Sequence, residues 1–181
     1  VGGTLSSPWI DAAPDDLAPR YVRLQCAEFL RMWDGDHPRY EVDRQLTLVI
    51  VKILMSIKCA KGFARGRTVA SALAGFDWLI IVALLCCKDR ATGRRRYRKA
   101  LLEICRKNGK TFLVAVMMLL LFLTEPDFSR FFSVAPDGDL AREVKQAMEP
   151  LIRTNSEVLA GELKVLRDVI RSRGTGTEYK P

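Results

Sequence analysis

The sequence predicts an all-α fold, a compact bundle of six to seven helices around a nearly all-apolar central helix. Two observations support this prediction. Apolar residues make up 49% of the 181 residues and recur at helical spacing over long stretches. Strand and hairpin patterns are nearly absent. We expect an extended acidic N-terminal arm at 1–16, one helical domain over 17–172, and a flexible tail at 173–181.

The first helix is expected to begin at Pro19, because proline is favoured at the first helical position. Apolar side chains from Val22 to Trp33 then recur at helical spacing and form one face. The sequence DGDHP at 34–38 ends the helix and places the only histidine, His37, in a solvated loop.

The next two segments are apolar nearly all round. Residues 40–61 contain no Gly or Pro and are too long for one strand, so we predict a buried helix at 45–58, with a strand over 45–53 as the alternative. Residues 68–87 carry one charge, Asp77, and are long enough to cross a bilayer. A carboxylate at the centre of a span costs about 3 kcal/mol, which favours a central core helix over a membrane span.

Three helices are predicted in the second half of the chain, after a basic helix that Asn108 and Gly109 end. One is a core helix at 111–123, too short to cross a bilayer. Asp139 caps the next, and Pro150 ends or kinks it. A last helix begins near Ser156.

The last predicted helix carries a stripe of apolar side chains at 4-3-4 spacing, as in a short coiled coil. We predict self-association through this stripe, to a dimer or a larger oligomer, with inward packing as the alternative. Its residues are Leu159, Leu163, Leu166 and Ile170.

The positive charge of the chain is concentrated in 88–110. This segment has ten Lys or Arg against Asp89 and Glu103, a surplus equal to the formal net charge of +8. Like charges without interleaved acids repel, so an anionic partner is expected to offset the repulsion. The predicted anion-binding residues are Lys88, Arg90, Arg94, Arg95, Arg96, Arg98, Lys99, Arg106, Lys107 and Lys110.

The charge pattern leaves the identity of the anion open. The phosphates of RNA or DNA fit such a cluster, as do acidic lipid headgroups on a membrane surface. A run such as RRRYRK at 94–99 also resembles a nuclear localisation signal. Recognition of bases is not expected, because Tyr97 is the single aromatic residue among the cations.

The cysteines indicate the compartment. The five cysteines are odd in number and lack CxxC spacing, so neither a metal site nor a disulfide framework is expected. Buried free thiols in apolar segments suit a reducing cytoplasm or nucleus, with peripheral membrane attachment as an alternative.

No catalytic motif is complete in the sequence. The elbow GxSxG, the phosphate loop GxxxxGK[ST] and the dinucleotide motif GxGxxG are all missing. The sequence GTGTEYKP at 174–181 resembles a glycine-rich loop but precedes no helix. We therefore expect no enzyme activity, no catalytic residue, no cofactor and no metal.

Together these patterns predict a non-enzymatic, self-associating structural protein that binds RNA, DNA or an acidic membrane, similar in architecture to viral matrix or nucleocapsid proteins. The first alternative is a helical regulatory adaptor that binds a partner protein through an apolar groove. The second is an integral membrane protein that spans the bilayer at 68–87.

Overall fold

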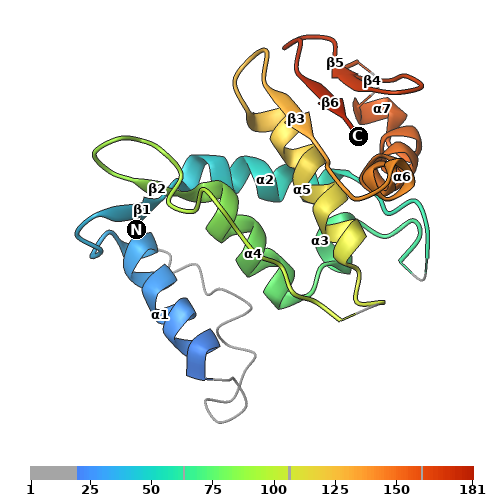
Figure 1. Ribbon diagram of the computed structural model, residues 1–181. Coiled ribbons are helices and arrows are strands. Elements are labelled where there is room, and N and C mark those ends of the chain that lie inside the picture. Colours follow the sequence, from blue (N-terminus) through green and yellow to red (C-terminus); the bar gives the residue numbers. More distant parts are fainter. Residues whose placement is uncertain (1–19, 63, 106, 160) are drawn as a thin grey trace. The chain divides into compact units, whose positions relative to one another are not determined.

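The computed structural model describes residues 20–62, 64–105, 107–159 and 161–181 (Figure 1). These residues form seven helices and six short strands in two sheets, so the all-α prediction is wrong and the fold is mixed α/β. The described residues divide into two compact units. Unit 1 comprises those in 1–47 and 75–100, and unit 2 comprises those in 48–74 and 101–181.

Unit 1 contains helices α1 (Arg20–Asp34) and α4 (Gly75–Cys86) and strands β1 (Tyr40–Val42) and β2 (Cys87–Asp89). The helix expected after Pro19 is confirmed as α1. The two strands pair antiparallel, with Tyr40 opposite Asp89 and Val42 opposite Cys87. This pairing brings the start of the basic segment beside the turn that follows α1.

His37 is not the solvated loop residue that the sequence predicted, because only 9% of its surface is exposed. Its Nδ1 accepts hydrogen bonds from the backbone N–H groups of Arg39 (3.1 Å) and Tyr40 (2.8 Å). Its Nε2 lies 3.0 Å from Glu28 Oε1 and therefore donates the remaining hydrogen bond. The imidazole thus closes the turn between α1 and β1.

The expected helix at 45–58 is confirmed as α2 (Arg44–Ser56), which begins in unit 1 and continues in unit 2. The single helix expected at 68–87 is wrong: it is divided into α3 (Val69–Ala72) and α4, with Leu73 in an extended conformation between them. The Thr68 hydroxyl caps α3 by accepting a bond from the Ser71 N–H. Within the described residues, no helix is long and apolar enough to cross a membrane.

Helices α5 (Lys110–Thr124) and α6 (Gly138–Thr154) pack against each other in unit 2. The core helix expected at 111–123 is confirmed as α5. Its buried residues lie on several sides and are Leu113, Ala115, Val116, Leu119, Leu120 and Phe122. Asp137, rather than Asp139, caps α6 by accepting a bond from the Leu140 N–H (2.8 Å), and the helix continues past Pro150.

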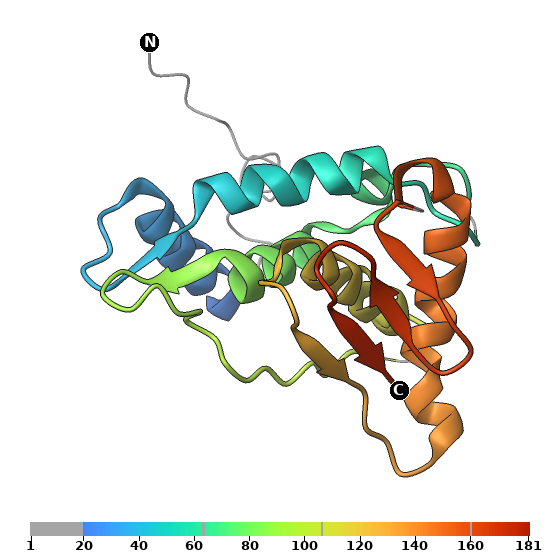
Figure 2. The ribbon, with the colours of Figure 1, turned by 90° about the horizontal axis from the view of Figure 1, so that it is seen from above.

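The second half of unit 2 forms a four-stranded sheet where a helix and a flexible tail were expected (Figure 2). Its strand order is β3-β6-β5-β4, with β3 (Arg130–Phe132) parallel to β6 (Glu178–Lys180) and the other pairs antiparallel. The expected tail supplies β6, whose Tyr179 is fully buried and hydrogen-bonds Ser133 (2.7 Å).

The last helix expected from Ser156 stops after one turn, α7 (Ser156–Leu159). The chain then turns into β4 (Leu163–Val165) and β5 (Ile170–Ser172), which pair with Leu163 opposite Ser172. The expected stripe therefore does not form. Leu159, Leu163 and Ile170 are buried within the chain, and Leu166 is half-buried between the two strands.

A close contact joins the loop before β3 to the turn before β6. Phe128 and Gly176 both have left-handed backbones, with φ of 63° and 67°. The Phe128 N–H donates to Thr175 O (2.8 Å), and a Cβ added at Gly176 would lie 2.9 Å from the Phe128 ring. The contact requires glycine for both its conformation and its space.

The expected limits of arm, domain and tail stay predictions. The arm at 1–16 lies outside the described residues. The residues assigned to the tail take part in the sheet of unit 2.

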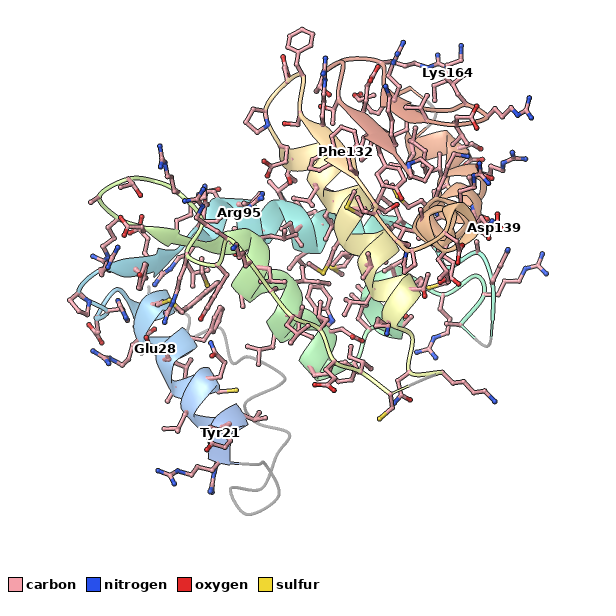
Figure 3. The ribbon with its side chains drawn as sticks, viewed as in Figure 1. Tyr21, Glu28, Arg95, Phe132, Asp139 and Lys164 are labelled. Atoms are coloured by element: carbon pink, nitrogen blue, oxygen red, sulfur yellow. The ribbon has the colours of Figure 1, made fainter. Side chains whose placement is uncertain are left out.

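Truncation of Leu163 tests its assignment to the core. Leu163 is 4% exposed, so Leu163→Ala should lower the free energy of unfolding by about 2–5 kcal/mol. The neighbouring Lys164 projects from the sheet (Figure 3), and Lys164→Ala should change it by less than about 0.5 kcal/mol. Urea unfolding followed by circular dichroism measures both. Unchanged stability of the Leu163 variant, with a loss of oligomeric mass, would instead identify an interface.

Candidate phosphate-binding site

The basic segment is not a helix. After β2 the chain turns at 90–93, where Gly93 has a φ of 66°, and Arg95 then bridges back to Lys88. The Arg96 N–H donates to Cys87 O (2.8 Å), which continues the pairing. The chain from there to Cys105 has no helix, so the expected basic helix is wrong.

Asp89 determines this turn. Its Oδ1 accepts from the backbone N–H groups of Ala91 and Thr92 (both 3.1 Å), and its Oδ2 accepts from Arg39 Nε (2.8 Å). A side chain that bonds the backbone two and three residues ahead favours a turn over a helix. The bond from Arg39 and those from Thr92 outweigh burial and hold the pKa of Asp89 below its ordinary value.

Glu28 on α1 holds the next part of the basic segment in place. Its Oε1 accepts from both terminal nitrogens of Arg96 (3.2 Å each) as well as from His37. Burial raises the pKa of Glu28, but the hydrogen bonds from Arg96 and His37, together with the charge of Arg96, outweigh burial and lower it. Arg96 also lies over the rings of Tyr40 (4.5 Å) and Tyr97 (5.0 Å). Arg96 is therefore an internal anchor.

The expected anion-binding residues separate into several groups. Lys88 pairs with Asp43 (2.6 Å), and Arg90 pairs with Glu41 (3.7 Å) and donates to Gly35 O (2.7 Å). Arg94, Arg95 and Arg98 line a hollow together with Tyr97, and Figure 3 shows Arg95 in the segment after β2. Lys99 is exposed, and Arg106 lies outside the described residues. Lys107 lies in the loop before α5, and Lys110 is the first residue of α5.

The loop before α5 has an unusual backbone. Lys107 and Gly109 both have positive φ, 69° and 73°, on either side of Asn108. A left-handed conformation is uncommon for a residue with a side chain and marks candidate functional positions. Successive N–H groups in such loops converge and form concave anion-binding sites.

The first turn of α5 presents free donors next to this loop. The helical bonds start with Leu113 N–H donating to Gly109 O (2.9 Å), so the N–H groups of Lys110, Thr111 and Phe112 have no helical acceptor. Gly109 provides no side-chain cap, and the first turn contains no acid. The helix dipole adds partial positive charge at this end.

The side chains of this turn are also available. Lys110 is exposed and Thr111 is half-buried, and neither side chain makes a hydrogen bond or ion pair with the part of the chain that the structure describes. A free ammonium, a hydroxyl and three orphan N–H groups together form a site for a phosphate group.

The complete phosphate-loop motif is absent at this site because Ile104 stands where the motif has its first glycine. Residues 104–111, ICRKNGKT, match the rest of GxxxxGK[ST]. The apolar run at 111–123, expected to be a helix, directly follows GKT. A GK[ST] triplet followed by a predicted helix is the feature of the sequence that could have identified the site.

A comparison with protein families identifies the chain. The family model of the terminase large subunit, ATPase domain, matches residues 78–176, which is more than half of the chain. The range includes the loop before α5 and all of α5. The chain therefore belongs to the terminase large subunit ATPase domain family. No curated protein and no solved structure matches it.

Family membership overturns two predictions and supports a third in part. A non-enzymatic protein of matrix or nucleocapsid type is wrong, because terminase large subunits belong to the viral DNA packaging motor. The expectation of no enzyme activity is wrong, because the matched domain is an ATPase. The predicted nucleic-acid partner is supported for DNA, whereas self-association and binding to an anionic membrane stay predictions.

The cysteines and acids offer no preformed metal site. Among the described residues, no group of three or more His, Cys, Asp or Glu side chains could hold a metal ion. Burial raises the pKa of Cys86 to about 11 and that of Cys87 to about 12, so both thiols stay protonated at neutral pH.

Acid should weaken unit 1 through Asp89. Since its pKa is lowered on folding, its contribution to stability is complete above the unfolded pKa of about 3.9 and is lost as the pH falls through the folded value. The difference in unfolding free energy between wild type and Asp89→Asn should therefore be largest above about pH 5 and shrink below about pH 4. Chemical denaturation at each pH measures it.

Asp139→Asn provides the control, because Asp139 is exposed in the first turn of α6. Its difference from wild type should be small at every pH. A difference for Asp89→Asn that stays constant down to about pH 2 would contradict the assigned role.

Proposed function

We propose that residues 107–111 bind the phosphates of a nucleoside triphosphate, and that the chain acts as the nucleotide-binding part of an ATPase that packages DNA. The observation that carries this proposal is the left-handed loop at Lys107 and Gly109 immediately before the free N–H groups of α5. It lies within the range that matches the terminase ATPase domain.

Each group of the loop has a distinct role in this proposal. The loop and the N–H groups of Lys110 and Thr111 surround the phosphate oxygens, as in other phosphate loops. The Lys110 ammonium reaches the β- and γ-phosphates and neutralises charge that builds up when the terminal phosphate is transferred. Gly109 allows the backbone to approach the phosphates because it has no side chain.

Thr111 is the residue that would hold Mg²⁺. Mg²⁺ at phosphate sites keeps several waters and binds the phosphates, so one hydroxyl of the chain can complete its ligands. When bound, Mg²⁺ neutralises the charge of the phosphate oxygens. The half-buried position of Thr111 in the first turn of α5 is appropriate for this role.

DNA is the proposed second partner. The surplus of cations in 88–110 suits a phosphate backbone, and the family links the chain to DNA packaging. Lys107 and Lys110 are assigned to the nucleotide, so we expect the arginines nearer β2 to contact the DNA backbone.

Replacing one lysine tests the nucleotide site. Lys110→Ala should lower the affinity for a fluorescent ATP analogue with Mg²⁺ by about 10- to 100-fold, because it removes charged hydrogen bonds worth about 1.5–3 kcal/mol. Fluorescence anisotropy measures the affinity, and unlabelled ATP should displace the analogue.

Lys99→Ala is the matched control, because Lys99 is also exposed and makes no ion pair with the described residues. It should change the affinity by less than about twofold. Equal losses in the two variants would show that net charge alone attracts the nucleotide. An unchanged affinity for Lys110→Ala would contradict the site.

A further inference from the structure

Unit 1 contains a second candidate site, separate in sequence from the loop before α5. It is a hollow of about 490 Å³ lined by Arg94, Arg95, Tyr97 and Arg98. The hollow is open to solvent and not enclosed, so part of a ligand bound there would stay exposed. Three of the four lining residues are cations, so an anion is the ligand that such a site selects.

Arg96 does not line the hollow, but its contacts determine the geometry of the hollow. Arg96 is bonded to Glu28 and stacked on Tyr40 and Tyr97, and its side chain is 19% exposed. This anchor fixes the backbone of the segment on α1. Arg94, Arg95 and Arg98, which lie on both sides of Arg96 in the sequence, therefore come together at the hollow although the segment is not a helix.

Tyr97 is held in place as well as exposed to the hollow. Its hydroxyl accepts a hydrogen bond from Gln25 Nε2 on α1 (3.3 Å), and the Arg96 guanidinium lies over its ring. A fixed aromatic ring loses little conformational entropy when a ligand stacks against it.

Two cations of the hollow, Arg94 and Arg98, have no acidic partner among the described residues. Both side chains are exposed. Arg95 is half-buried, and burial lowers its pKa although the Cys86 thiol partly opposes this. Arg94 and Arg98 carry like charges four residues apart, and one bound anion would be attracted to both.

We propose that the hollow binds one nucleotide of an unpaired nucleic-acid strand, with its phosphate on Arg94 and Arg98 and its base against Tyr97. Every base offers a face for stacking, so binding is independent of sequence. In a duplex the base faces are covered by their neighbours, and Tyr97 would have no role. The proposal does not depend on nucleotide binding at residues 107–111.

The test uses the Lys110→Ala chain, so that phosphate binding at the start of α5 does not contribute. Anisotropy of a labelled oligodeoxythymidine gives the affinity. Arg94→Gln with Arg98→Gln should weaken binding by about tenfold or more, because the double variant removes two charged contacts to the phosphate. Tyr97→Leu should weaken it by about five- to 100-fold through the loss of stacking.

Lys164→Gln with Arg167→Gln is the matched control, because both residues are exposed cations of unit 2. It removes the same charge and should leave the affinity within about twofold. Circular dichroism of each variant confirms that it is folded. Equal binding by the Arg94/Arg98 variant and the control would overturn the proposal, as would unchanged binding by Tyr97→Leu.

Competition identifies the source of the nucleotide. Displacement by unlabelled oligodeoxythymidine but only weakly by thymidine monophosphate supports a strand as the ligand. Equal displacement by the monophosphate, per nucleotide, supports the same site with a free nucleotide. Stronger displacement by duplex DNA than by the single strand would overturn the proposal.

Discussion

The burial of α5 is the constraint on which unit 2 depends. This helix is apolar on several sides, so it must be covered along most of its length. Helix α6 packs along it, and Phe131 of β3 lies 5.5 Å from the ring of Phe122. Lys110, at its start, is exposed, whereas the other residues of the helix are buried or half-buried. The apolar helix thus fixes where a charged ligand can approach its dipole.

In unit 1 the main constraint is the run of like charges at 94–99, which repel one another. A helix would place Arg94 to Lys99 within less than two turns, with no acid among them. The structure keeps the run out of helix by the Asp89 turn and bonds one arginine to Glu28. Glu28, distant in sequence, therefore pairs with one charge of the run, and Asp89, just before the run, holds the turn that keeps it out of a helix.

Periodicity predicted the helices well and the strands poorly. Helices α1, α2, α5 and α6 have apolar residues at helical spacing, and all four were expected close to their observed limits. The six strands are three residues each, too short for an alternating pattern. Leu159, Leu163 and Ile170 have helical spacing by coincidence; the turn at Gly161 separates the first two, and the connection between β4 and β5 separates the last two.

The functional site was predicted in part. Charge counting located the basic segment, including Lys107 and Lys110, but assigned one role to ten residues. The positive φ of Lys107 is a backbone property that residue type does not reveal, since lysine rarely adopts it. The ion pairs of Lys88 and Arg96 join residues far apart in the chain, so only the fold distinguishes structural cations from available ones.

The contact between Phe128 and Gly176 restricts which substitutions the chain can accept at these two positions. A side chain at position 176 would displace the aromatic ring, and a smaller residue at 128 would remove this steric obstacle but not the strain of a left-handed backbone at 176. The two positions are therefore not free to vary one at a time. Among natural relatives, glycine at 176 should accompany an aromatic residue at 128, and the order of substitution should begin with the loss of the ring.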